Sequence, residues 1–232
     1  MQTILITGAN RGLGLEFVQQ LLKQETRLFA CCREPEKADT LSKLSKSTPD
    51  RLELVTCDVA SKESIIQAVR EVKSKTNQID LLINNAGILI NDETLDSLQA
   101  ETLVQNFWVH AIGPTLLIRE CLPLLKASPK AKILNLSSQL GSLNNKMSGG
   151  NYSYSSSKAA LNMLTRCMAI DLRHEGVIAV VVHPGWVKTS MGGPHAAITP
   201  TESVTGMLKL VQGLNEADTG KFFTWTGERH PW

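Results

Sequence analysis

Residues 4–14 read Ile4-Leu5-Ile6-Thr7-Gly8-Ala9-Asn10-Arg11-Gly12-Leu13-Gly14, an apolar run that leads directly into a glycine-rich segment. A strand followed by a glycine turn and a helix is the context in which such glycines bind a dinucleotide. Gly8 allows a tight turn, Gly12 lets the backbone approach a diphosphate, and Gly14 lets the helix pack close to the sheet. The helix N-terminus would attract the phosphate charge. Taken alone, the pattern also fits an ordinary turn between a strand and a helix.

Short apolar runs alternate with longer segments of helical period along the chain. Alternation repeated this often predicts a parallel sheet with helices on both faces, and nearly continuous apolar strands are expected when both faces are covered. The predicted strands are Ile4–Thr7, Arg27–Cys32, Leu52–Cys57, Leu81–Asn84, Lys132–Leu136, Val177–Val182 and Phe222–Thr224. The predicted helices lie near residues 12–24, 36–46, 61–75, 96–125, 153–174 and 200–213. We therefore expect a single-domain α/β protein over residues 1–232, with a Rossmann-type doubly wound parallel sheet.

Composition limits the possible partners and the compartment. The 232 residues carry a formal net charge of +2 with scattered basic residues, which gives no reason to expect a nucleic acid or an anionic membrane as partner. The longest apolar runs are far below the ~20 residues that span a bilayer. The first strand begins at residue 2 or 3, which leaves no room for a signal peptide. Five irregularly spaced cysteines fit no zinc or disulfide pattern, so we expect a cytoplasmic protein with reduced thiols and no metal.

A second informative segment is Tyr154-Ser155-Ser156-Ser157-Lys158. On a helix, residues four apart lie on the same face, so the Lys158 ammonium would sit under the Tyr154 phenol. A positive charge there favours the phenolate and lowers a pKa that is normally about 10. A phenol tuned in this way can exchange a proton with a substrate oxygen. Tyr152 is the weaker candidate, because four residues beyond it lies Ser156 rather than a lysine.

Three further motifs accompany these two segments. They are Asn84-Asn85-Ala86-Gly87, Ser138 at the end of the fifth predicted strand, and Pro184-Gly185 after the sixth. In their order and separations, all five resemble the signature of the short-chain dehydrogenase/reductase family over essentially the whole chain. The stretch from His183 to Thr189 and the terminal His230-Pro231-Trp232 resemble a smaller subgroup, the sniffer-type carbonyl reductases and C-factor-like proteins.

The resemblance implies roles for individual residues. Tyr154 would be the proton donor, Ser138 (or, as the alternative, Ser137) would hydrogen-bond the substrate oxygen, and Lys158 would also bind the nicotinamide ribose. Asp58 and Val59 would border the adenine, and the segment after the sixth strand would border the nicotinamide. The implied cofactor-binding residues are Gly8, Asn10, Arg11, Gly12, Leu13, Gly14, Arg33, Asp58, Val59, Asn85, Ala86, Gly87, Tyr154, Lys158, Pro184, Gly185, Val187 and Thr189.

Charges near the second strand favour NADP(H) over NAD(H). An acidic residue at the end of that strand would bind the ribose 2′-hydroxyl and repel a 2′-phosphate. Here the strand ends at Cys32-Arg33, and the first carboxylate is Glu34. Arg33 and Arg11, which lies in the glycine turn, together suit a phosphate dianion. A register shift of one residue would place Glu34 on the ribose, so NAD stays open.

One position departs from the family pattern. The stretch of residues 107–114 resembles the segment that usually carries an asparagine, here replaced by His110. The resemblance implies that this residue helps to hold a water that links the lysine to solvent, largely through its backbone carbonyl in a kinked helix. Asn106 offers an alternative register, but that register breaks the match to Gly113-Pro114. The departure leaves open whether the imidazole takes part in proton relay.

These observations predict an NADPH-dependent reductase of aldehydes or ketones. The alternatives are an NAD-linked alcohol dehydrogenase and a dinucleotide-binding signalling protein with little turnover. The resemblance also implies a homodimer or homotetramer. A largely apolar pocket for a small-molecule carbonyl substrate is expected, with candidate lining residues Ile88, Leu89, Ile90, Leu140, Met147, Trp186 and Met191.

Overall fold

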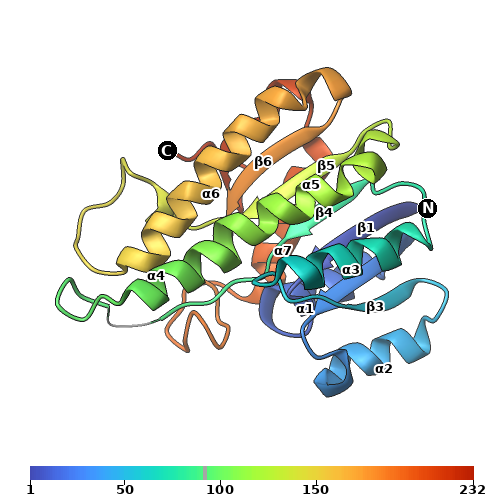
Figure 1. The fold of residues 1–232 in the computed structure, drawn as a ribbon, viewed down its shortest axis with the longest axis horizontal. Helices are drawn as coiled ribbons and strands as arrows, with labels where there is room; N and C mark the ends of the chain where they lie inside the picture. Colours follow the sequence, from blue (N-terminus) through green and yellow to red (C-terminus); the bar gives the residue numbers. More distant parts are fainter. Residues whose placement is uncertain (91–92) are drawn as a thin grey trace.

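Seven parallel strands form one sheet in the order β3-β2-β1-β4-β5-β6-β7 (Figure 1). The computed structural model describes residues 1–90 and 93–232. The strands are β1 (Gln2–Thr7), β2 (Thr26–Cys32), β3 (Leu52–Thr56), β4 (Leu81–Asn84), β5 (Lys132–Leu136), β6 (Ile178–His183) and β7 (Phe222–Thr224). The order runs outward in opposite directions from β1 and β4, which is the doubly wound arrangement that the sequence predicts.

Helices cover both faces of the sheet (Figure 1). They are α1 (Gly12–Leu21), α2 (Asp39–Ser47), α3 (Lys62–Lys73), α4 (Ala100–Phe107), α5 (Gly113–Lys126), α6 (Tyr152–Asp171) and α7 (Pro200–Gly213). Each predicted strand is found to within two residues at either end. Among the residues described, no helix is long and apolar enough to cross a membrane.

The strand pleat divides the apolar core into two layers. Successive side chains of a strand point to opposite faces. In β1, Ile4 and Ile6 therefore pack with α1 and α7, whereas Leu5 packs with α3 and α5. In β2, Phe29 follows Leu5 into the second layer. Because both faces are buried, the strands are apolar at almost every position, as expected for a parallel sheet.

The helix predicted over residues 96–125 is interrupted by a π-helical turn at Trp108–Ile112. Pro114 has no N–H with which to meet the carbonyl of His110 four residues earlier, so regular α-helical pairing cannot continue through this point. The N–H of Gly113 pairs instead with the carbonyl of Trp108 five residues earlier. A methyl group on Gly113 would lie 2.0 Å from the carbonyl oxygen of Val59, so only glycine fits here. The interruption expected at this point of the helix is therefore a π-helical turn.

Candidate active site

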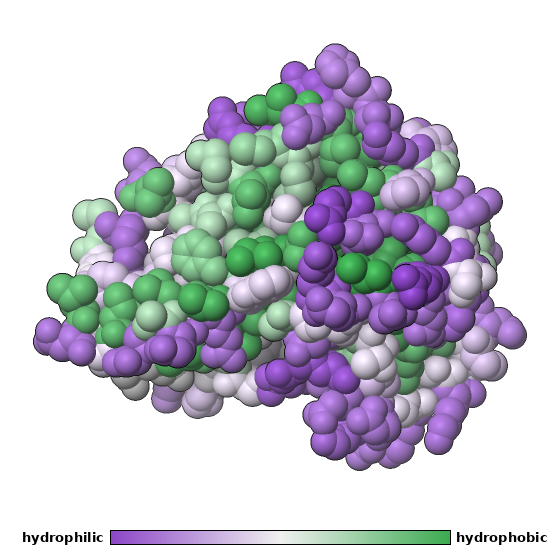
Figure 2. Space-filling view, in the orientation of Figure 1, coloured by the Kyte–Doolittle hydropathy of each residue, from purple (hydrophilic) through white to green (hydrophobic). Residues whose placement is uncertain are grey.

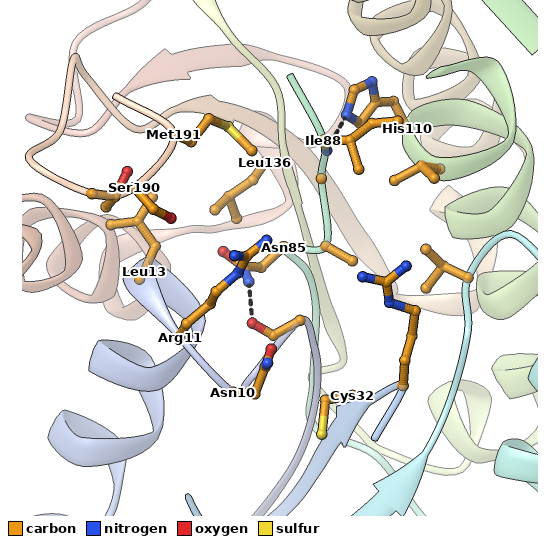
Figure 3. Close-up of a pocket in the computed structure, with 18 of the residues that line it drawn as sticks. Asn10, Arg11, Leu13, Cys32, Asn85, Ile88, His110, Leu136, Ser190 and Met191 are labelled. Atoms are coloured by element: carbon orange, nitrogen blue, oxygen red, sulfur yellow. Dashed lines mark hydrogen bonds between the residues drawn. The ribbon is translucent and has the colours of Figure 1, made fainter. Parts of the chain in front are cut away.

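A cleft of about 360 Å³ opens at the carboxyl edge of the sheet, where the strand order reverses between β1 and β4 (Figure 3). Open α/β sheets bind their ligands at this point. The residues that line the cleft are Gly8, Asn10, Arg11, Gly12, Leu13, Cys32, Arg33, Glu34, Lys37, Cys57, Asp58, Val59, Asn85, Ala86, Gly87, Ile88, Val109, His110, Leu136, Ser137, Tyr154, Lys158, Pro184, Thr189, Ser190 and Met191.

The glycine turn is fixed from the neighbouring strand by Asn85. The Asn85 amide donates to the carbonyl of Thr7 at 2.9 Å and to that of Gly8 at 3.1 Å, and the second of these bonds is drawn in Figure 3. The Asn85 backbone N–H also donates to the Thr7 hydroxyl at 3.1 Å. Gly8 itself adopts a left-handed conformation, with φ of +65°. The side chain of Asn85, which the sequence analysis names only as a cofactor-binding residue, thus holds the turn.

The first turn of α1 is open to the cleft. Arg11 occupies the N-cap position but makes no side-chain capping hydrogen bond, and the first turn contains no acidic residue. The N–H groups at a helix start have no partners within the helix and carry partial positive charge. Backbone donors that face a glycine-lined cleft form a cradle that fits a diphosphate.

Besides Lys158, three cationic side chains line the same cleft: Arg11, Arg33 and Lys37. Figure 3 shows the Arg11 side chain reaching into the cleft from the glycine turn. The Glu34 carboxylate forms an ion pair with Lys37, and this contact lowers the pKa of Glu34. Lys37 was missed in the sequence analysis, although it lies only four residues after Arg33 in the segment that follows β2.

The predicted catalytic residues lie together at the other end of the site. The Lys158 ammonium lies 5.7 Å from the centroid of the Tyr154 ring and donates to the carbonyl of Leu136 at 2.8 Å. Ser138 follows β5, accepts from the N–H of Leu140 at 3.1 Å and lies near enough to the Tyr154 phenol to lower its pKa. Ser137 instead turns toward the backbone carbonyl of Lys158, at 3.5 Å. Ser138 is therefore the serine whose hydroxyl influences the phenol.

Burial is the main influence on the pKa values of Tyr154 and Lys158. It raises the pKa of Tyr154 above its usual value, although the hydrogen bond with Ser138 acts in the opposite direction. Burial lowers the pKa of Lys158 to about 7. The expectation that Lys158 depresses the phenol pKa is therefore wrong in this structure. The physical reason is that the lysine charge is itself disfavoured by burial, and the ammonium bonds a carbonyl rather than the phenol oxygen.

Both ring nitrogens of His110 are engaged. Its Nε2 accepts from the backbone N–H of Ile88 at 3.0 Å (dashed in Figure 3), so Nε2 carries no proton, and Nδ1 donates to the Ser157 hydroxyl at 2.9 Å. The ring also packs edge-on against Tyr154, with centroids 5.2 Å apart. Burial, assisted by the charge of Lys158, lowers the His110 pKa well below its usual value. The imidazole is thus a neutral bridge with no free nitrogen for proton relay.

A few predicted site residues do not line the cleft. Gly14 lies behind the turn, where an added methyl group would lie 2.0 Å from the Gly8 carbonyl oxygen. Val187 is buried and pairs with Ile198, and Gly185 packs against Ile198 and Trp225. These three residues shape the backbone rather than the cleft surface. Ser138 is not among the lining residues either, but it is only half-buried and directly follows Ser137, which lines the cleft. Of the candidate substrate-pocket residues, Ile88 and Met191 line the cleft.

Comparison with known proteins identifies the family. The sequence profile described as short chain dehydrogenase matches residues 2–197, and the chain belongs to this family of oxidoreductases. Its structure is similar to that of the NADPH-bound carbonyl reductase from chicken fatty liver, with a TM-score of 0.95 and 40% identity over 100% of this chain and 99% of that one. The carbonyl reductase Sniffer of D. melanogaster is similar over 100% of both chains, with a TM-score of 0.95 and 33% identity.

The C-signal protein of Myxococcus xanthus is 41% identical over 157 residues, which are 68% of this chain and 95% of that protein. The resemblance to the family and to its sniffer-type and C-factor-like members is therefore confirmed.

Gly14→Ala tests the close approach at the glycine turn. The added methyl group collides with a backbone oxygen that cannot move freely, so we expect a loss of about 3 kcal/mol in the free energy of unfolding, measured by urea denaturation. Gly213→Ala is the matched control, because nothing lies within 4 Å of its added methyl group. The control should be neutral or stabilising. Equal stabilities for the two variants would contradict the proposed constraint.

The buried neutral imidazole of His110 predicts a pH-dependent stability. The unfolded chain binds a proton at the ordinary histidine pKa of about 6.5, whereas the folded chain does not, so stability falls as the pH decreases. Between pH 7 and 5.5 this histidine should account for about 1 kcal/mol of the loss. His110→Asn should remove that part of the slope in denaturation curves. His174→Asn, which replaces an exposed histidine, should keep the wild-type slope; a wild-type slope in His110→Asn would show that the ring is protonated when folded.

Proposed function

We propose that this protein is an NADPH-dependent reductase of aldehyde or ketone carbonyls. The observation that carries the proposal is that Ser138, Tyr154 and Lys158 lie close together beside a cleft whose opposite end is cationic. One end of the cleft suits a phosphorylated dinucleotide, and the other suits protonation of an oxygen. The carbonyl reductases to which the fold is similar support the same reading.

The residues present fit NADPH. The glycine turn and the open start of α1 would take the diphosphate, and Arg11, Arg33 and Lys37 would meet the 2′-phosphate. Glu34 also lines the cleft, but its ion pair with Lys37 offsets its negative charge, which supports NADP(H) over the NAD alternative. The cofactor-binding residues proposed are those predicted from the sequence, together with Lys37.

The chain's own residues would then supply the proton. When bound, NADPH supplies the hydride for the carbonyl carbon. The Tyr154 hydroxyl donates its proton to the carbonyl oxygen, and its raised pKa keeps that proton in place at neutral pH. The Ser138 hydroxyl orients the phenol and donates to the same oxygen. Lys158, with a pKa of about 7, returns a proton from Nζ toward the phenol oxygen between turnovers.

The predicted oligomeric state remains a proposal. A homodimer or homotetramer is supported by apolar side chains gathered over α4 and α6 (Figure 2), among them Val104, Met163 and Ile170, which are exposed.

The similarity to C-signal supports a signalling role as the second candidate function. We favour the enzyme, because a binding module has no need of an assembled Ser138–Tyr154–Lys158 group. A cytoplasmic location stays a prediction.

The cationic end of the cleft predicts cofactor selectivity. NADPH should bind more tightly than NADH, and Arg33→Ala should cost about 1.5–3 kcal/mol of NADPH binding free energy while leaving NADH affinity unchanged. Lys37→Ala should act in the same direction. Lys43→Ala removes an exposed cation that does not line the cleft and is the matched control. Calorimetric titration of both cofactors measures these affinities, and equal wild-type affinities would refute the assignment.

Removal of the phenol hydroxyl should abolish reduction without loss of cofactor binding. Tyr154→Phe should lower kcat for carbonyl reduction by at least about 100-fold, since a positioned acid contributes on that scale. Tyr152→Phe, two residues earlier on the same helix, is the control and should retain activity. Lys158→Ala should weaken both NADPH binding and turnover. Substantial turnover by Tyr154→Phe would rule out this proton donor; the assay is NADPH consumption over a panel of carbonyl compounds.

A further inference from the structure

Glu93 is a buried acidic residue that the proposed mechanism does not use. Only 7% of its surface is exposed, although it belongs to the segment between β4 and α4. Its carboxylate accepts from the Ser153 backbone N–H at 2.7 Å and also from the Ser153 hydroxyl. Its backbone carbonyl accepts from the Asn151 N–H at 3.1 Å. All three bonds reach the start of α6, 60 residues away in sequence.

Helix α6 lacks a cap of its own. Asn151 precedes it in a left-handed conformation, with φ of +53°, and makes no capping hydrogen bond with its side chain. The first turn also contains no acidic residue. The first N–H groups of a helix need partners, and a negative charge near them is stabilising. Glu93 supplies both a hydrogen-bond acceptor and a negative charge from a distant part of the chain.

The same face of α6 is held at a second point. Ser153 and Ser157 are four residues apart, so they lie one above the other on the helix. Glu93 bonds Ser153, and the His110 ring bonds Ser157 at 2.9 Å. We call these two contacts the α6 clamp. Because Tyr154 and Lys158 each follow a clamped serine directly, the clamp fixes the rotation and height of the face that carries them.

The clamp also connects the two ends of the site. The segment that carries Glu93 starts at Asn85, which holds the glycine turn, and continues through Ile88, whose N–H bonds His110. Displacement of Glu93 would therefore loosen α6 relative to the part of the chain that supports the cofactor turn. A phenol displaced by about 1 Å from its reacting partner loses much of its rate advantage.

We propose that Glu93 is a positioning residue, which sets the placement of Tyr154 by capping α6 from the segment that follows β4. This inference rests on the proposed function, because it assigns Glu93 a part in the same proton transfer. Glu93 does not line the cleft, and its carboxylate reaches α6 through Ser153.

The test compares Glu93→Ala and Glu93→Gln with Asp96→Asn, which removes an exposed carboxylate from the same segment. Glu93→Ala should lower kcat roughly tenfold or more while NADPH affinity stays within about twofold. Glu93→Gln keeps an acceptor for the Ser153 N–H, so it should recover most of the rate. Asp96→Asn should match the wild type. Rates are compared well below the melting temperature of each variant.

A second measurement needs no turnover. The chain has two tyrosines, so ¹³C labelling of the tyrosine ring carbon that bears the hydroxyl gives two NMR signals, assigned with Tyr152→Phe. We expect the Tyr154 signal to shift or broaden in Glu93→Ala and to stay near its wild-type position in Glu93→Gln. A lower melting temperature with unchanged kcat and an unchanged Tyr154 signal would overturn the proposal, since Glu93 would then only stabilise the fold. If Glu93→Ala does not fold, Ser153→Ala decides, because it removes one of the two contacts of the Glu93 carboxylate: wild-type kcat and an unchanged Tyr154 signal in that variant would overturn the proposal.

The two readouts separate the two proposals. If the wild type reduces no carbonyl compound, the proposed function fails. The Tyr154 signal still reports whether Glu93 places the phenol.

Discussion

The close approach of the first turn of α1 to the end of β1 is the constraint on which the rest of the site depends. A side chain on Gly14 would occupy the position of the Gly8 carbonyl, at 2.0 Å, so helix and strand can meet at this distance only through glycine. The approach leaves the start of α1 uncapped and facing the cleft. It also places the Gly8 carbonyl where the Asn85 amide bonds it. An anion-binding turn and its support from β4 therefore follow from one steric requirement.

Helix α6, which carries Tyr154 and Lys158, is also fixed on the side that faces the sheet, by hydrogen bonds distinct from those of the α6 clamp. Toward the sheet, a buried polar chain runs from Asn84 to Asn135 at 2.7 Å and from Asn135 to Thr165 at 2.8 Å, and so joins β4, β5 and α6. Thr165 lies seven residues, or about two turns, beyond Lys158 on a similar face. Buried hydrogen bonds of this kind are costly to break, because each lost partner leaves a desolvated polar group. Such rigidity allows an ammonium group to be held in a site that disfavours its charge.

The sequence predicted the fold and most of the cleft because these features are local. Strands such as Leu81–Asn84 and Lys132–Leu136 are short apolar runs, and the glycine turn lies within eight residues of its strand. Glu93 could not be found in this way, since its partner is 60 residues distant and no periodicity marks it. The pKa of Tyr154 was predicted in the wrong direction because spacing reveals a neighbouring charge but not the burial of both groups. Desolvation is a property of the packed chain, and here it dominates.

The histidine that departs from the family pattern is consistent with the same site architecture. Pro114 removes the N–H that would otherwise pair with the His110 carbonyl, whatever side chain stands at position 110. A role for that carbonyl therefore survives replacement of the usual asparagine. The imidazole is large enough to reach both the Ile88 N–H and the Ser157 hydroxyl, so it adds a link between the segment after β4 and α6. Because burial keeps the ring neutral, this link places no additional charge beside Lys158, whose ammonium is already destabilised.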